Sequence, residues 1–496
     1  MGFSLLALLG LGLTTWLILD DEDDTPVRRD PASDEDPPMQ DMPDMPDDPS
    51  DPPPDPLTGT GEDTVTGDFR DDRFELSDNA VGFGEAGEDT FDLSDRAQGF
   101  GGPGNDVFAI QDNATGRGGA GEDTFDATGS ISQSFGDAGD DVLTLGGQAE
   151  GFGGDGNDRI IATGRADADG DNGEDTITAS NFARVDGGPG ADTIDVQDEA
   201  TARGGDGDDV ITATGMTEGF GGNGNDVLTA RDGASIFGED GDDTLSISFN
   251  TLGDGGDGDD VIEADGGTGR GGAGDDILTA IDNSPSFFGD EGNDTITAPI
   301  ASFVSGGQGN DVITAGNSST VTGGDGDDTL NLTGGSRGLG DAGNDVILAN
   351  TSAFGDGGAG DDTLEARNEA TVLGGEGDDT LRGFVNKLQG QGIVLGGGEG
   401  ADRFEIREAE FVNPPGAVFE PDPANQQPRL IVEDFDPDVD VIAIQGITFD
   451  EVTLLDPGNG NTDLLVTRDD GTGFKVGLIS VTPDDIADNA IQIMPT

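Results

Sequence analysis

The stretch Gly101-Gly102-Pro103-Gly104-Asn105-Asp106-Val107-Phe108-Ala109 decides the fold of this 496-residue chain. Its pattern is Gly, Gly or acid, any residue, Gly, any residue, Asp, any residue, large apolar residue, any residue. Eighteen copies lie between Gly84 and Asp379, and most of the intervals between their Asp residues have the same length as that from Asp89 to Asp106. A regular repeat of this kind is typical of a solenoid, in which each repeat forms one coil and buries its core face only against neighbouring coils.

The glycines and the aspartate of this motif have separate chemical roles. Glycines at positions one, two and four allow a tight turn with positive φ and leave carbonyl oxygens accessible. A carboxylate two residues after the last glycine completes an all-oxygen ligand set, which suits a hard cation such as Ca²⁺. One turn supplies too few oxygens for six to eight ligands, so we expect each ion between two coils. The candidate metal ligands are Asp89, Asp106, Asp123, Asp141, Asp158, Asp175, Asp192, Asp209, Asp226, Asp243, Asp260, Asp276, Asp294, Asp311, Asp328, Asp345, Asp362, Asp379 and, in a last motif turn, Asp402.

The residues that follow each Asp predict the core. The residue two positions later is always Phe, Leu or Ile, and the residue two further on is usually Ala, Leu, Ile or Val. This period of two indicates a short strand with one face inward. The opposite half of each repeat has mostly Ala, Ser, Gly or Val at its inward positions, so the core is thin, with about four modest side chains per coil. The motif does not recur in that half, which predicts plain turns on one edge and a single row of cation sites on the other.

The motif resembles the RTX (hemolysin-type) nonapeptide repeat of secreted bacterial calcium-binding proteins, over residues 59 to 402. The resemblance implies an all-β fold, a right-handed parallel β-roll or β-helix with coils of about 17 residues. It also implies that the Asp at position six and the turn carbonyls ligate calcium. The chain departs from the tandem form of the family, because its motif recurs at almost twice the nonapeptide length. An acid replaces the second glycine in six turns, and we expect altered turns or an extra ligand there: Glu85, Asp137, Asp171, Glu239, Asp290 and Asp341.

The charge of the chain, −84 at pH 7, opposes a compact metal-free state. We therefore expect calcium to supply much of the folding free energy. The rival hypothesis is that the Asp row is structural and its carboxylates accept hydrogen bonds from turn amides. Position five varies, with Asn105, Asp208 and Ala191 as examples, so we expect it to matter less than position six. The acidic surface argues against nucleic acid and anionic membranes as partners.

Three further parts flank the β-roll of residues 58–402. Residues 1–19 are almost entirely apolar, and the alternatives are an uncleaved membrane anchor, a signal peptide or a fused export-related segment. Contact with a membrane is expected only there. Residues 20–57 are rich in Asp and Pro and predict a disordered linker. Residues 403–496 are rich in strand-forming residues and resemble the C-terminal capping segment of serralysin-type proteins, which implies a small β-rich cap and an uncleaved type I export signal.

The chain has no His, Cys or Tyr, which excludes Ser-His, Cys-His and His-ligated zinc mechanisms. We expect no enzymatic activity and an extracellular or cell-surface bacterial protein that acts as a spacer, adhesin or matrix component. The alternative is a carboxylate-dependent, polysaccharide-active enzyme in residues 403–496. Ice binding by the Thr residues that often follow the motif Asp is a third hypothesis, although Val, Arg and Ile interrupt that row.

The residue before each first glycine should point outward. Phe83 and Phe100 share this place on consecutive coils, as do Phe135 with Phe152 and Phe220 with Phe237. We expect three stacked pairs, which either cover the turn backbone or form a contact face for a glycan or a surface protein.

Overall fold

The computed structural model describes most of the roll and parts of the C-terminal region. The expected hydrophobic segment 1–19 and the linker as far as Pro54 lie outside the described residues. The described ranges are 55–128, 131–385, 392–408, 430–445, 449–455, 460–468, 473–486 and 490–494. Among them, no helix is long and apolar enough to span a membrane.

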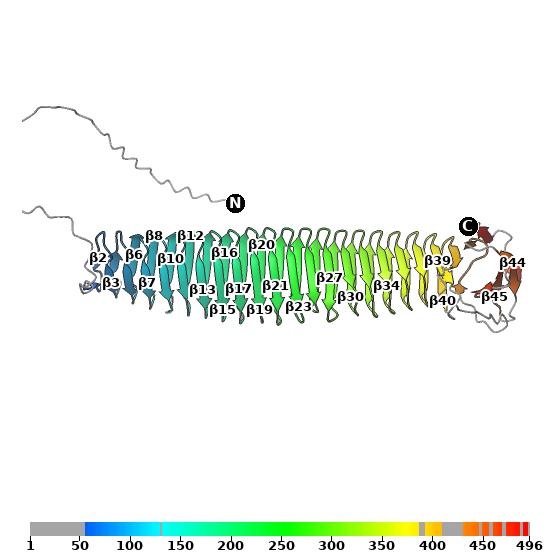
Figure 1. Ribbon diagram of the computed structural model, residues 1–496, viewed down its shortest axis with the longest axis horizontal. Helices are drawn as coiled ribbons and strands as arrows, with labels where there is room; N and C mark the ends of the chain where they lie inside the picture. Colours follow the sequence, from blue (N-terminus) through cyan, green and yellow to red (C-terminus); the bar gives the residue numbers. More distant parts are fainter. Residues whose placement is uncertain are drawn as a thin grey trace, which may run out of the picture. The chain divides into compact units, whose positions relative to one another are not determined.

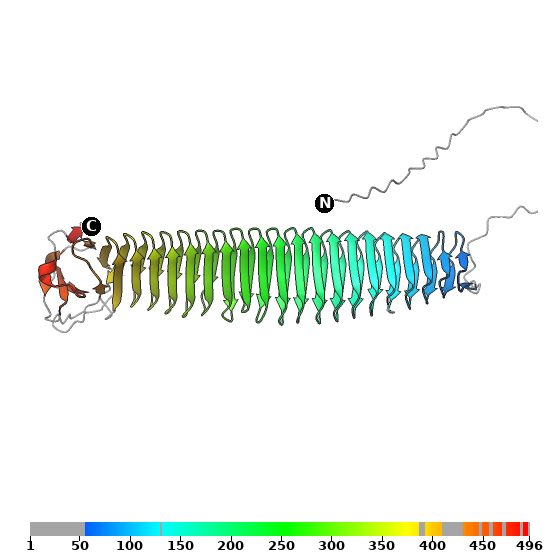
Figure 2. The same cartoon turned by 180° about the vertical axis from the view of Figure 1, so that it is seen from behind.

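From Leu57 onward the chain winds as a solenoid of two facing parallel sheets, and each coil adds one strand to each sheet (Figures 1 and 2). The predicted all-β parallel solenoid is therefore confirmed, and most of its coils are 17 residues long, as between Asp192 and Asp209. One 3₁₀ turn, Pro483–Asp485, is the only helical element in the described residues. We call the strands that follow each motif Asp the first sheet and the strands that enter the motif glycines the second sheet.

The first sheet consists of β1 (Leu57–Gly59), β3 (Arg73–Leu76), β5 (Thr90–Leu93), β7 (Val107–Ile110), β9 (Thr124–Ala127), β11 (Val142–Leu145), β13 (Arg159–Thr163), β15 (Thr176–Ser180), β17 (Thr193–Gln197), β19 (Val210–Thr214), β21 (Val227–Arg231), β23 (Thr244–Ser248), β25 (Val261–Asp265), β27 (Ile277–Asp282), β29 (Thr295–Ala298), β31 (Val312–Ala315), β33 (Thr329–Leu332), β35 (Val346–Ala349), β37 (Thr363–Ala366), β39 (Thr380–Val385), β41 (Arg403–Glu408), β43 (Val441–Gln445) and β47 (Ile491–Met494).

The second sheet consists of β2 (Thr64–Thr66), β4 (Val81–Phe83), β6 (Gln98–Pro103), β8 (Thr115–Ala120), β10 (Gln133–Ala138), β12 (Glu150–Asp155), β14 (Asp167–Asn172), β16 (Arg184–Pro189), β18 (Thr201–Asp206), β20 (Glu218–Asn223), β22 (Ser235–Asp240), β24 (Leu252–Asp257), β26 (Thr268–Ala273), β28 (Ser286–Glu291), β30 (Phe303–Gln308), β32 (Thr320–Asp325), β34 (Arg337–Ala342), β36 (Phe354–Ala359), β38 (Thr371–Glu376), β40 (Ile393–Glu399), β42 (Leu430–Glu433), β44 (Phe449–Leu455), β45 (Thr462–Arg468) and β46 (Gly473–Leu478).

The core is as thin as the sequence predicts. In a central coil, Ile211 and Ala213 of the first sheet face Ala202 of the second, with Ala200 at the turn, and all four are buried. The same positions align in neighbouring coils, because Ile211 pairs in register with Ile194 and Leu228. At the start of the roll this inward row carries large rings, and Phe74, Phe91, Phe108 and Phe125 form one buried stack with centroids 4.5–4.7 Å apart.

Changes in repeat length fall on the plain edge of the roll. The shortest interval, from Asp260 to Asp276, shortens the turn between Asp265 and Thr268, while β25 and β26 keep their register with β23 and β24. The register of β25 with β27 shifts between Ala264 and Asp265, next to the same edge. These plain turns are closed locally, as where the Ala114 amide donates to the carbonyl oxygen of Gln111. The motif turns on the other edge are therefore free to stack without interruption.

The C-terminal strands continue both sheets and then cover the end of the roll. β43 and β47 extend the first sheet beyond β41, whereas β42 and β46 extend the second sheet beyond β40. β44, β45 and β46 form an antiparallel meander, the one departure from parallel pairing in the described residues. Antiparallel strands at the end of a solenoid change the pairing direction, which suits a segment that protects an open sheet edge.

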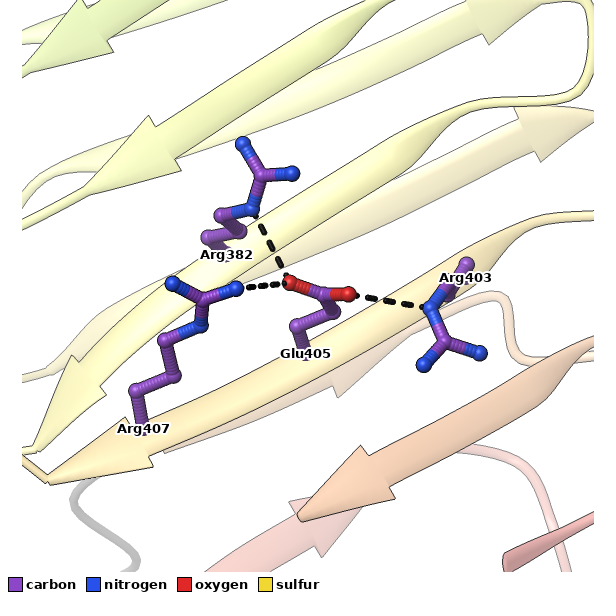
Figure 3. Close-up of polar contacts among 4 residues, drawn as sticks. All are labelled: Arg382, Arg403, Glu405 and Arg407. Carbon is purple, nitrogen blue, oxygen red and sulfur yellow. Dashed lines mark hydrogen bonds and ion pairs between the residues drawn. The ribbon is translucent and has the colours of Figure 1, made fainter. Parts of the chain in front are cut away.

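A compact charge cluster lies on the outer face of the first sheet at the start of this region (Figure 3). The buried Glu405 carboxylate accepts hydrogen bonds from Arg382, Arg403 and Arg407 at 2.9, 3.0 and 2.7 Å. Burial alone would raise the pKa of Glu405, but the three arginine hydrogen bonds outweigh it and lower that pKa. The cluster joins β39 to β41 across the coil where the motif interval lengthens to 23 residues.

Candidate metal centre

Each motif turn brings the backbones of adjacent coils into close contact. In the turn between β18 and β19, Gly205 and Gly207 have φ values of 124° and 136°, which residues with a side chain rarely adopt. Gly204 is required for a different reason. A Cβ at Gly204 would collide with the Asp209 carboxylate and lie 2.5 Å from the Gly221 carbonyl oxygen of the next coil. The first glycine of the motif therefore makes room for the carboxylate of its own turn.

The aspartates at position six form one continuous ladder along this edge. Asp209 Oδ1 accepts the amide hydrogen of Asp192 at 2.7 Å, and Asp226 Oδ1 accepts that of Asp209 at 2.7 Å. The same bond joins every successive pair of predicted ligands from Asp89 to Asp402, at 2.6–3.0 Å. The structure thus places all nineteen predicted residues on one line. The rival hypothesis, that the Asp row is structural, predicted hydrogen bonds from turn amides to these carboxylates. Such hydrogen bonds are present, but they join adjacent coils instead of residues within one turn.

In eighteen of these nineteen aspartates, the second carboxylate oxygen, Oδ2, is buried and has no hydrogen-bond donor. Asp209 Oδ2 is buried and has no donor, and it lines the same space beside the α-carbon of Gly204 as the Gly221 carbonyl oxygen does, so two acceptors border this space. Such an arrangement is unfavourable in a buried site unless a proton or a cation is supplied. The residues with a buried Oδ2 that lacks a donor are Asp89, Asp106, Asp123, Asp141, Asp158, Asp175, Asp192, Asp209, Asp226, Asp243, Asp260, Asp276, Asp294, Asp311, Asp328, Asp345, Asp362 and Asp379.

Burial and mutual repulsion change the acidity of the ladder. Burial raises the pKa of Asp209 to about 7, the hydrogen bond from the Asp192 amide opposes this effect, and the charges of Asp192 and Asp226 add to it. The same kinds of cause raise the pKa of Asp276 to about 8. Without a bound cation, these carboxyl groups would hold protons near neutral pH.

The ladder has a terminal residue at each end that the sequence analysis did not assign. At the N-terminal end, Asp72 Oδ2 accepts the amide hydrogen of Asp68 at 2.8 Å. At the C-terminal end, Asp440 Oδ1 accepts that of Asp402, and its Oδ2 accepts that of Asp436 at 2.8 Å. In both terminal residues Oδ2, the oxygen that lacks a donor in most of the ladder, therefore accepts a backbone amide hydrogen. The signal for Asp440 was present in Asp440-Val441-Ile442, which repeats the Asp-any-apolar pattern without the glycine turn.

Position five forms a second ladder that sequence reasoning missed. Asp208 Oδ1 accepts the amide hydrogen of Asn225 at 2.9 Å, and Asn225 Oδ1 accepts that of Asp242 at 3.0 Å. These bonds run in the opposite direction to those of position six and lie at the exposed surface. Asp and Asn serve equally well because the hydrogen bond needs only one side-chain oxygen. Ala191 has none and interrupts the ladder. The frequent occurrence of Asp and Asn at position five was the feature of the sequence that could have revealed this second ladder.

The acids at the second glycine position alter their turns locally. Their φ values are 63–79°, whereas the glycines at this position reach 101–129°. Three of the acids pair with arginines on the outer face of the second sheet: Asp137 with Arg117, Glu239 with Arg203 and Asp290 with Arg270, at 3.2–3.3 Å. An altered turn is confirmed, and at these three positions the carboxylate is paired with a guanidinium.

The ligand set that this edge offers consists mostly of backbone oxygens. In the described residues, no three Asp or Glu side chains converge on one point. A cation between two motif turns would therefore combine one or two ladder carboxylates with turn carbonyls. This donor set contains only oxygen, which fits a hard cation with flexible coordination and does not fit a metal that prefers nitrogen or sulfur ligands.

Comparison of the sequence with protein-family models gave no match, and comparison with curated proteins gave no significant match.

Proposed function

We propose that this protein is a calcium-binding β-roll that folds around ions held between successive motif turns. The observation that carries the proposal is the row of buried Asp Oδ2 atoms without donors, each of which lies beside the first glycine of its motif together with a carbonyl oxygen of the next coil. The residues suit calcium, because the atoms that could ligate the ion at this edge are carboxylate and carbonyl oxygens. The resemblance of the motif to RTX repeats supports the same ion. When bound, calcium would neutralise the buried carboxylates and connect adjacent coils.

In biological terms, we propose an extracellular or cell-surface component of a bacterium, with a structural or adhesive role. Extracellular calcium is available at concentrations that suit weak, repeated sites, and a chain that stays unfolded without calcium is easier to export before it folds. The solenoid is long, stiff and acidic, which are useful properties in a spacer or matrix protein.

The experiment compares two adjacent substitutions that remove the same charge. Asp209→Asn keeps the Oδ1 acceptor for the Asp192 amide and replaces the orphaned Oδ2 with a nitrogen that cannot ligate calcium. Asp208→Asn is the matched control, because Asn occupies this position at Asn225 and makes the same bond. Isothermal titration with calcium should show fewer ions bound, or at least about tenfold weaker binding in mid-roll, for Asp209→Asn alone. Equal titrations of the two variants, or no calcium binding by the natural chain, would refute the proposal.

A further inference from the structure

The outward face of the first sheet differs from the rest of this acidic molecule. From β15 to β31, the two outward rows nearest the motif edge consist almost entirely of Thr, Val, Ile and Ser. Within the described stretch 176–315, the charged residues in these two rows are Asp195 and Glu263. We name these two rows, over these nine strands, the neutral face.

Apolar side chains of the neutral face are open to solvent. Val210, Val227, Ile277 and Val312 are each 43–48% exposed, and all occupy the first outward position after a motif Asp. Strand propensity alone does not require this composition. The second sheet has Arg203, Phe220 and other bulky or charged residues at outward positions of the same coils. A regular, uncharged strip on a chain of charge −84 calls for a specific explanation.

We infer that the neutral face is the contact surface between two copies of this chain, which associate face to face as parallel or antiparallel rods. It is the place where two strongly acidic molecules meet with the least repulsion. Nine strands spaced by ~4.8 Å, with two outward rows that span about four residues of each strand, present roughly 550 Å², so a pair would bury about 1,100 Å², near the lower limit for specific interfaces. A two-fold arrangement also closes the assembly at a dimer, since the described part of each copy has one such face.

The charge distribution sets this contact apart from another candidate. The cluster of Arg382, Arg403 and Arg407 around Glu405 could attract acidic segments of a neighbouring molecule. Association through that cluster would weaken as salt screens the attraction, whereas association through the neutral face should strengthen because salt screens the repulsion between the two copies.

The test is sedimentation of the full chain in saturating calcium over a range of protein and salt concentrations. The expected result is a dimer with a Kd of about micromolar order, tighter at about 0.5 M than at about 0.05 M NaCl. A chain that stays monomeric at every salt concentration up to about 100 μM protein, or a dimer that dissociates as salt rises, would overturn the inference.

Matched variants locate the contact. Thr229→Glu with Thr297→Glu adds two charges to the neutral face, in the row that already contains Asp195 and Glu263. Thr201→Glu with Thr320→Glu adds the same charge to the second sheet, in the row that contains Glu218. The first pair should weaken dimerisation at least about tenfold and the second should leave it unchanged. Equal effects would contradict the proposed location. Circular dichroism of each variant shows whether it still folds in calcium. A variant that folds but does not associate has lost only the contact between copies, whereas a variant that does not fold bears on the calcium proposal instead.

A second measurement avoids added charge. Because the chain has no cysteine, single nitroxide labels can be placed at Ser246→Cys in the middle of the neutral face and at Ser235→Cys on the second sheet. Dipolar coupling between copies is expected for the label at position 246 and not at position 235. The reverse pattern would assign the contact to the other sheet.

Discussion

At the residue scale, the two oxygens of each ladder aspartate are in different environments. One oxygen receives a backbone amide hydrogen and fixes the turn to the coil before it, as Asp209 does with Asp192. The other is buried beside the first glycine of its own turn and has no donor. A single residue type thus sets the register of the coils and leaves one acceptor for a cation, and the glycine at position one is what makes this geometry possible.

Substitution of that glycine tests the close approach directly. In Gly204→Ala the new methyl group would overlap the Asp209 carboxylate, so the turn must open, and we expect a loss of about 2 kcal/mol or more in stability together with weaker calcium binding. Gly146→Ala is the control, because a Cβ there has its nearest neighbour at 3.4 Å and the residue lacks a positive φ. Urea unfolding in calcium measures both. Similar midpoints for the two variants would show that the first glycine is not constrained by the carboxylate.

At the residue scale, the sequence predicted the positions of side chains correctly where the regular spacing of the motif determined them. The regular recurrence of Asp placed all the position-six carboxylates on one edge, and the structure confirms that alignment. Position five was undervalued because its mixture of Asp, Asn, Glu and Ala resembles tolerance, although its Asp and Asn side chains accept backbone hydrogens between coils. The role of Asp440 was missed because its turn lacks the glycines that identified the others.

At the scale of strands, two kinds of phenylalanine row stabilise the stacking of coils. The inward rings of Phe91 and Phe108 are buried and parallel. The outward rings of Phe220 and Phe237 stack at 5.0 Å with an interplanar angle of 12°, as the sequence predicted. Because these outer rings stack on each other along the roll axis, they present mainly their edges to solvent, a geometry poorly suited to stacking a sugar on a ring face.

This difference predicts unequal effects of removing the rings. Phe108→Ala would leave a cavity between Phe91 and Phe125 and should lower stability by about 3–5 kcal/mol. The double change of Phe220 and Phe237 to Ser should cost only about 1–2 kcal/mol, because the rings are only partly buried, and should leave calcium-dependent folding intact. Thermal unfolding in calcium measures both effects. Loss of folding in the double variant would show that the outward rings belong to the core.

The strands of the repeats could largely be predicted from the sequence, whereas the pairing of the C-terminal strands could not. Alternation after each Asp identified every first-sheet strand of the repeats, because only one face of each strand is buried. The antiparallel meander of β44 to β46 could not be derived, since residues 403–496 lack a repeat and their apolar runs fit either pairing direction. The sequence analysis noted the row of Thr, Val and Ile that follows the motif Asp but not the second uncharged row beside it, because the two rows form one face only when alternate residues of nine coils are aligned in space.

At the scale of the whole molecule, charge decides which state is stable. The chain carries −84, and its ladder places buried carboxyl groups in a line with no positive side chain among them in the described roll. Two agents can neutralise that line, protons or metal ions. In the absence of metal, the raised pKa values, about 7 for Asp209 and about 6 for Asp226, indicate neutralisation by protons.

These shifts predict that acid stabilises the metal-free roll. A carboxyl group whose pKa rises from about 3.9 when unfolded to about 7 when folded contributes stability that is complete below about pH 4 and is lost as pH rises through about 7. Exposed carboxylates stay ionised between about pH 5 and pH 8, so the ladder dominates this range. Metal-free protein should therefore show more β signal in circular dichroism at pH 5 than at pH 8. A signal that falls on acidification would contradict the assigned shifts.

The most direct test of the central claim is a calcium titration of metal-free protein at pH 8, followed by far-ultraviolet circular dichroism. We predict a largely unfolded spectrum without calcium and a β-rich spectrum in millimolar calcium, with saturation at roughly one ion per gap between motif turns, about 18 in all. Magnesium at the same concentration should be much less effective, because it demands a smaller and more regular site. A full β spectrum that persists in excess chelator and does not change on addition of calcium would contradict the account.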